Sequence, residues 1–209
     1  MQFEIKDLQQ CNYLDSLKIQ EKVRKKVADG IFNSVLIIVE HDHVYTLGKN
    51  AKESNILKKT CPIIKTNRGG DVTYHGPGQI VVYPIFNLKE LNIGVKAYVK
   101  KIELVIMKTL ENFKINSDVL MEETGVWTNG KKIASIGINV SKGLTMHGLS
   151  INVNTDLSFY KDIISCGIPD VKMTSIEKEL GKKIPMNDIK KLLINNFKHI
   201  FVNDSIKTA

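Results

Sequence analysis

Helical spacing of apolar residues is the clearest periodic pattern in this chain. Residues 95–113 carry an apolar side chain at every third or fourth position, which predicts an amphipathic helix. The same reasoning predicts helices over residues 12–28, ended by Gly30, and over residues 189–201. Each of these helices is expected to bury one apolar face.

Shorter apolar runs with many β-branched residues predict strands between the helices. They cover residues 35–40, 43–47, 61–67 and 80–86. We expect the 43–47 strand to pair with the 35–40 strand. The 61–67 strand should lead into a glycine-rich loop and the 80–86 strand should leave it.

A hairpin is predicted where Asn129-Gly130 separates residues 126–128 from residues 132–140, because Asn-Gly is a strong turn signal between strands. Alternation of apolar residues continues beyond it, so an antiparallel meander is expected over residues 126–154.

The rest of the chain reads as a long loop over residues 154–170 and a short helix. A capping box formed by Thr174 and Glu177 opens that helix, and Gly181 ends it. Strands and helices mix without a regular βαβ rhythm. The pattern predicts one α+β domain over residues 1–209, with a mixed, mostly antiparallel sheet flanked by helices.

Composition places the chain among ordinary globular proteins. It is 43% hydrophobic and 25% charged, with no signal peptide and no apolar run near the roughly 20 residues that span a bilayer. Three cysteines cannot all pair with one another. We expect a cytoplasmic protein without disulfides and without a membrane partner.

Charge adds an indication about partners. Lys and Arg number 30 and Asp and Glu 22, a net charge of +8, and the lysines are spread in short clusters. Such a surface favours acidic macromolecules as partners, but it gives no indication of nucleic-acid binding.

Residues 68–79 contain four glycines, a proline, an arginine and a histidine between two apolar strands. A simple turn needs only about two to five residues. The composition therefore favours a binding loop, with Arg68 and His75 supplying polar groups. The alternative is a glycine-rich connector.

Cys166 and Lys132 are the candidates for covalent chemistry. Cys166 lies in a loop before Gly167, which would let a substrate approach and whose N–H could bind an oxyanion. Lys132 enters an apolar strand, where it could act as a cation beside a thiolate or as a base. The alternatives are a small buried cysteine and a solvated hairpin lysine. Cys11, expected in a helix, and Cys61, expected in a strand, fit the structural role better.

Histidines and one glycine-rich segment give weaker signals. His75 and His147 could each line a pocket, although a structural role is favoured for His147. His41 and His43 have no third ligand nearby, so no metal is expected. Residues 125–132 nearly match a phosphate-binding loop but lack its Ser or Thr, and the hairpin explains them better.

These segments together resemble one known family. The matching motifs are residues 68–79, 125–127, 132–137, 147–153 and 165–167. In this order they are similar to the lipoate-biosynthesis octanoyltransferases, also called lipoyl(octanoyl) transferases. The resemblance implies the fold of the biotin and lipoate protein ligase catalytic domain.

The resemblance also implies a reaction. An octanoyl group would move from octanoyl-acyl carrier protein to a lysine of apo lipoyl domains, in 2-oxoacid dehydrogenase E2 subunits and the glycine cleavage H protein, without ATP or another cofactor. Cys166 matches the acyl-thioester nucleophile and Lys132 its partner lysine. The implied substrate-binding residues are Arg68, Gly69, Gly70, Asp71, Val72, Thr73, Tyr74, His75, Ser135, Ile136, Gly137, Gly148, Leu149 and Ser150.

Two other functions remain open at this point. An ATP-dependent lipoate–protein ligase would share the fold but would not need Cys166. A non-catalytic module that binds an acyl group or a carrier protein would form no adduct on Cys166.

Overall fold

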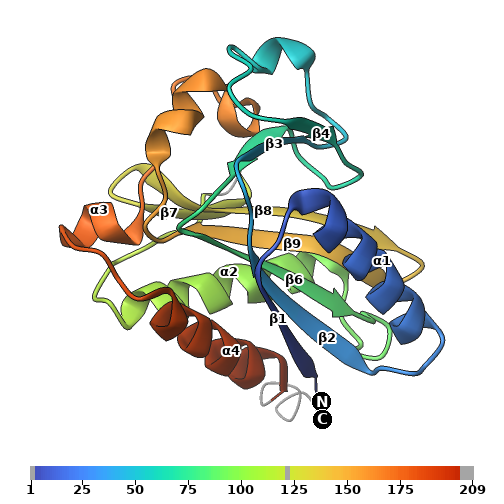
Figure 1. Ribbon diagram of the computed structural model, residues 1–209. Coiled ribbons are helices and arrows are strands. Elements are labelled where there is room, and N and C mark those ends of the chain that lie inside the picture. Colours follow the sequence, from blue (N-terminus) through green and yellow to red (C-terminus); the bar gives the residue numbers. More distant parts are fainter. Residues whose placement is uncertain (1–2, 121–122, 203–209) are drawn as a thin grey trace.

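The computed structural model describes residues 3–120 and 123–202, which form two sheets of unequal size (Figure 1). The large sheet has the order β1-β2-β6-β9-β8-β7 and the small sheet the order β4-β3-β5. Strands of the large sheet are β1 Glu4–Gln10, β2 Ser34–Glu40, β6 Gln79–Phe86, β9 Leu144–Asn152, β8 Lys131–Ser141 and β7 Gly125–Thr128. Those of the small sheet are β4 Ile63–Lys65, β3 Val44–Leu47 and β5 Val72–His75.

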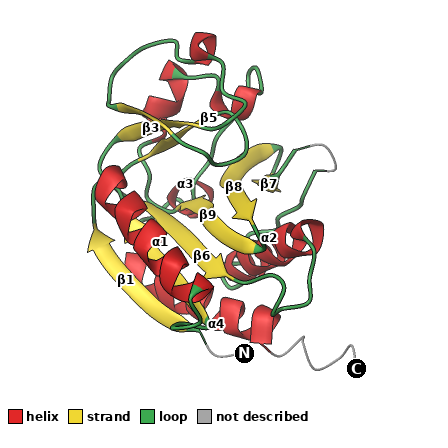
Figure 2. Cartoon of the chain, turned by 90° about the vertical axis from the view of Figure 1, so that its right-hand side faces the viewer, coloured by secondary structure: helices red, strands yellow, loops and turns green. Residues whose placement is uncertain are grey.

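Helices cover both faces of the large sheet. Helix α1, Tyr13–Ala28, lies on one face, and helices α2, Val95–Glu111, and α4, Met186–Val202, pack on the other (Figures 1 and 2). Alternation along β2 produces this arrangement, because Ile37 packs in the α1 cluster while Leu36 and Ile38 belong to the core on the α2 and α4 side. The predicted α+β architecture and the three long helices are confirmed.

Strand pairing makes the large sheet mixed. Strand β1 runs parallel to β2, and the remaining pairs of this sheet are antiparallel. Strand β1 was not expected from the sequence. Its side chains are almost all exposed, so its residues lack the apolar alternation that marks a strand buried on one face.

The predicted pairing of residues 43–47 with residues 35–40 is wrong. Strand β3 instead pairs in parallel with β4 and antiparallel with β5, so it belongs to the small sheet. The glycine-rich segment supplies β5 itself, so four of the twelve residues of the expected loop form this strand. Only Ile63–Lys65 of the expected strand over residues 61–67 is regular, as β4.

The hairpin at Asn129-Gly130 is confirmed, with φ of 49° and 70° at its two turn residues. Positive φ at both positions is the geometry for which Asn-Gly is favoured. The short helix α3, Ile176–Leu180, is capped by Ser175, one residue after the expected Thr174, because the Ser175 side chain accepts from the N–H of Lys178.

The expected long loop contains two 3₁₀ turns, η2, Leu157–Asp162, and η3, Ser165–Gly167. A third, η1, covers Glu53–Asn55. Together with the small sheet these turns form the part of the molecule above the large sheet in Figure 1. Within the described residues, no helix has the length and apolar character needed to cross a bilayer.

Gly78 joins the glycine-rich segment to the chain after β9. Its carbonyl accepts from the backbone N–H groups of Val153 and Asn154, and its own φ is +79°. A methyl group at Gly78 would collide with the carbonyl of Asn154, whereas Gly30, with φ of +72°, has open space around it.

This contrast predicts that substitution by alanine lowers the free energy of unfolding by different amounts at Gly30 and Gly78. Gly30→Ala should cost about 1 kcal/mol, the penalty for a left-handed residue, whereas Gly78→Ala should cost about 3 kcal/mol or more because the clash adds to that penalty. Urea denaturation of both variants measures the difference. Equal losses of unfolding free energy in the two variants would show that the close approach of Gly78 to Asn154 adds nothing to the cost.

Candidate active site

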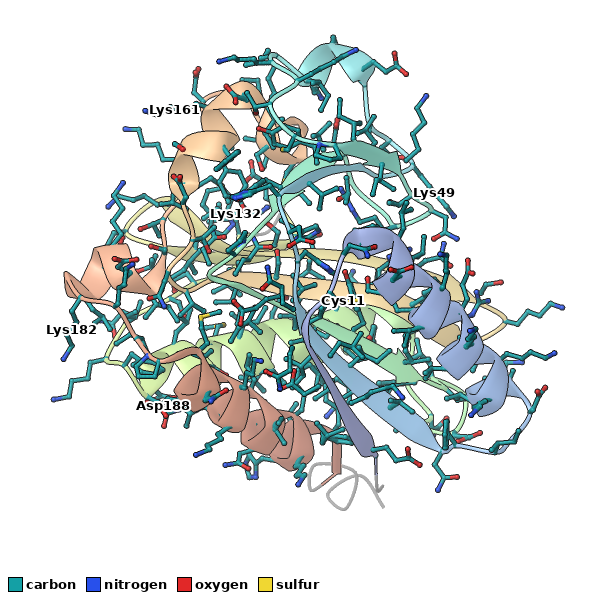
Figure 3. The ribbon with its side chains drawn as sticks, viewed as in Figure 1. Cys11, Lys49, Lys132, Lys161, Lys182 and Asp188 are labelled. Atoms are coloured by element: carbon teal, nitrogen blue, oxygen red, sulfur yellow. The ribbon has the colours of Figure 1, made fainter. Side chains whose placement is uncertain are left out.

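Strand β8 holds Lys132 in the interior, between the two sheets (Figure 3). Its backbone is fixed on the side away from β7 by residues 172–174, because the N–H of Lys132 donates to Lys172 O at 2.8 Å and the N–H of Thr174 donates to Lys132 O at 2.9 Å. The side chain is only 1% exposed. The alternative of a solvated hairpin lysine is therefore wrong.

Turn η3 presents Cys166. Its φ of 60° is uncommon for a residue with a side chain, and such conformations persist where surrounding contacts enforce them. Gly167 follows with φ of +72° and lies so close to the Asp71 carboxylate that a Cβ there would be 2.8 Å from Oδ2. The expectation that the Gly167 N–H binds an oxyanion is wrong, because this group donates to Ile164 O within the turn.

The two candidate groups meet although 34 positions separate them in the sequence. Lys132 Nζ lies 3.5 Å from Cys166 Sγ and 2.9 Å from Thr124 O, to which it donates. The Trp127 ring lies 5.2 Å from the same ammonium. Among the described residues, no carboxylate lies within ion-pair distance of Lys132. The thiol is thus the group beside it that can become an anion.

A cavity of about 370 Å³ opens at this pair. Of the residues expected to bind substrate, Val72 and Tyr74 do not line it. They alternate along β5 with Thr73 and His75, and they pack into the core of the small sheet instead. The other twelve line the cavity, together with Cys166 and Lys132.

Small residues of β8 and β9 make the floor of the cavity. Gly137 pairs with Gly148 across these strands, and Ser135 pairs with Ser150. A side chain at Gly148 would collide with Val82 O of the neighbouring strand. A side chain at Gly137 would come within 3.2 Å of Arg68 Cδ and Gly69 O, so glycine at these two positions lets the neighbouring strand and the glycine-rich segment approach closely.

Arg68 organises the roof. Its guanidinium donates to the carbonyls of Thr46, Gly69 and Asp71 at 2.6, 2.9 and 2.7 Å. Within the part of the chain that the structure describes, Arg68 has no carboxylate at ion-pair distance. Burial lowers its pKa from the ordinary value, but arginine keeps its charge in proteins, so the roof adds a second buried cation beside the cavity.

Several lining residues escaped the sequence reading. Tyr13 comes from helix α1, Tyr83 from β6, and Val95 and Val99 from the start of α2. Their apolar spacing indicated core positions and carried no signal of a cavity. His147, for which a structural role was favoured, also lines it.

The histidines near the cavity are held by hydrogen bonds. His41 contacts Cys11 O at 2.6 Å and the Tyr83 hydroxyl at 2.7 Å, and His43 contacts the Tyr74 hydroxyl at 2.8 Å. Burial lowers the pKa of His41 to about 4 and that of His75 to about 3. The rings of His41 and His75 are therefore neutral at pH 7.

Neither Cys11 nor Cys61 lies within the helix or strand in which it was expected. Cys11 precedes helix α1, whose N-cap is Asn12, and Cys61 precedes β4. Both are half-buried, neither lines the cavity, and burial raises the pKa of each thiol.

Residues 12–198 match the lipoyl protein ligase A/B catalytic domain. A curated relative named octanoyltransferase, from Alkaliphilus metalliredigens, is 38% identical over 217 residues and covers all of both chains. The chain therefore belongs to the lipoyl protein ligase A/B catalytic-domain family. Within it, the match to octanoyltransferases makes the protein an acyltransferase of the lipoyl(octanoyl) transferase kind.

Solved structures share the fold at low identity. A lipoate-protein ligase A bound with ATP gives a TM-score of 0.77 at 14% identity, with 96% of this chain and 85% of that chain covered. A biotin protein ligase from Aquifex aeolicus gives 0.58 at 14%, covering 98% and 71%. The predicted biotin and lipoate ligase fold is confirmed.

Three neutral buried histidines predict a pH-dependent stability. Burial lowers the pKa of His147 to about 4, as it lowers those of His41 and His75, while unfolded histidines titrate near 6.5. The unfolded state therefore binds more protons below pH 6.5, and the free energy of unfolding should fall as pH decreases. With three protons the slope approaches about 4 kcal/mol per pH unit near pH 5.5.

Urea denaturation between pH 7.5 and 5.5 tests this, in a range where most carboxylates stay ionised in both states. A free energy of unfolding that is flat over this range would contradict the buried neutral state.

Proposed function

We propose that the protein transfers an octanoyl group from octanoyl-acyl carrier protein to a lysine of apo lipoyl domains, through a thioester on Cys166. One observation carries the proposal: the buried ammonium of Lys132 lies 3.5 Å from the Cys166 sulfur and has no carboxylate partner in the described residues. A buried charge requires a partner, and a thiolate is the partner available here.

In the first step the Cys166 thiolate attacks the carbonyl carbon of the donor thioester. The new bond joins sulfur to the acyl carbon, and the bond to the carrier's pantetheine sulfur breaks. Lys132 gives its proton to the departing thiolate, which leaves as a thiol, and Lys132 remains as a neutral amine. The donor is already a thioester, so the step needs no ATP.

In the second step the acceptor lysine attacks the acyl-enzyme as a neutral amine. Its nitrogen forms the amide bond and gives a proton to Lys132, while Cys166 leaves as a thiolate. The ammonium and thiolate of the resting pair are thereby restored. An acceptor that arrives as an ammonium must first lose one proton to solvent, because its nitrogen has no lone pair.

The cavity suits the acyl group and the surface suits the two proteins. Its volume of about 370 Å³ falls within the range of small-molecule sites. Its floor of Gly137, Gly148 and Leu149 is largely apolar or backbone. A net charge of +8 favours acidic partners, the character we expect of the carrier protein and lipoyl domains.

The proposal predicts transfer without ATP. Octanoyl-carrier protein and apo lipoyl domain should yield octanoylated domain, and intact mass should show an octanoyl adduct on the enzyme alone. Cys166→Ser should lose the adduct and at least about 10³-fold in rate, whereas Cys61→Ser, outside the cavity, should keep both. Transfer only from free octanoate with ATP would favour a ligase instead.

A second prediction isolates Lys132. Lys132→Ala, loaded beforehand with octanoate on Cys166, should lose at least about 10²-fold in deacylation by the acceptor, because the attacking amine has no base. Lys131→Ala is the matched control, since Lys131 is partly exposed and pairs with Glu179 at 3.4 Å. Normal deacylation by Lys132→Ala in single-turnover experiments would exclude the base role.

A further inference from the structure

The cavity is lined by residues 135–138 of β8 and, across the sheet, by His147 of β9. A Cβ on Gly125 would lie 2.7 Å from Lys132 Cε, and Gly125 pairs with Ser135, so the ammonium lies level with Ser135. His147 pairs with Ile138, three residues further along β8. At about 3.3 Å per residue, roughly 10 Å of strand separate the two levels.

This separation matches the length of the acyl group in the proposed function, on which the inference rests. An extended eight-carbon chain advances about 9 Å, taking roughly 1.25 Å along the axis for each C–C bond of about 1.5 Å. A chain attached to Cys166 that follows β8 therefore ends near His147.

Two other elements hold His147 in an unusual conformation. Its φ is +59°, its N–H donates to Gln20 Oε1 on α1 at 3.0 Å, and its Nε2 lies 2.6 Å from Asn67 Oδ1 at the start of the glycine-rich segment. Because the amide oxygen accepts, Nε2 carries the proton and Nδ1 is left as an acceptor. Backbone strain of this kind is typical of functional positions.

The free nitrogen has no partner. His147 is 1% exposed and is one of the residues that line the cavity, and its Nδ1 is buried without a hydrogen bond from any described residue. A buried acceptor without a donor is costly, so a ligand or a water must supply one. Three other lining residues, Thr73, Glu123 and Ser135, also have an unpartnered side-chain oxygen, and of these Ser135 lies at the level of the thioester.

We propose that His147 is a specificity-determining residue that terminates the acyl pocket. Its Nδ1 accepts a hydrogen bond from a donor at the pocket's end, either a water or a hydroxyl on the terminal carbon of the acyl chain. An alkyl chain longer than eight carbons must displace that donor and leave Nδ1 unpaired, which limits the chain length.

The wild-type enzyme provides a direct test with two carrier-protein thioesters of equal length. The 8-hydroxyoctanoyl chain ends in a donor and the nonanoyl chain ends in a methyl group. We expect kcat/KM for acylation of Cys166 to be about tenfold higher for 8-hydroxyoctanoyl. Equal or better use of nonanoyl would overturn the proposal.

A variant pair tests the residue. Asparagine tolerates the left-handed conformation, so His147→Asn should shorten the end wall, raise the decanoyl-to-octanoyl ratio of kcat/KM about tenfold and abolish the preference for the terminal hydroxyl. Asn139→Ala is the control, because the Asn139 side-chain amide donates to Asn67 O at 2.7 Å. Its loss loosens the same segment but leaves the contacts of the His147 ring in place, so it should reduce kcat/KM for all chain lengths alike. The same change of profile in both variants would mean that His147 only anchors that segment.

Measuring the intact mass of the enzyme tests this inference separately from the proposed function on which it rests. Failure of the wild type to form any acyl adduct would contradict the thioester on Cys166, whereas an adduct that forms equally from nonanoyl and 8-hydroxyoctanoyl chains would contradict only the role of His147. Circular dichroism checks that the variants fold, and if His147→Asn does not, the wild-type comparison decides alone.

Discussion

The contact between the Lys132 ammonium and the Cys166 sulfur is the interaction that organises this molecule. Burying a lysine is costly, and here the compensation comes from Thr124 O, the Trp127 ring and a thiol. The two sheets keep these groups together: β8 of the large sheet carries the lysine, and the turns packed on the small sheet carry the cysteine. Neither layer alone makes the pair.

A second buried cation, Arg68, shows how differently a similar charge can be used. Its guanidinium donates to backbone carbonyls of the roof, whereas the Lys132 ammonium lies beside the Cys166 sulfur. The planar fork of arginine suits several fixed acceptors at once, while the single ammonium of lysine can give up and take back a proton. In this cavity the arginine fixes the backbone of the roof, and the lysine is the residue type that can exchange a proton.

Features that depend on a short stretch of sequence were predicted, whereas features that depend on contacts between distant segments were not. Helix α2 and the Asn129-Gly130 hairpin follow from local patterns and were predicted. Strand β1 is polar because it is an exposed edge, and the partners of β3 are chosen by packing of distant segments, so neither was found. The motif order suggested Cys166 and Lys132, but no local signal could bring Tyr13 to the same cavity.

The hydrogen bonds of Arg68 have a consequence for binding. A glycine-rich segment has more conformations to lose than any other when it becomes ordered. Here part of that entropy is lost during folding, because the guanidinium donates to the carbonyls of Gly69 and Asp71. A ligand that enters the cavity therefore meets a roof that is already ordered, and less of its binding free energy is spent on ordering the protein.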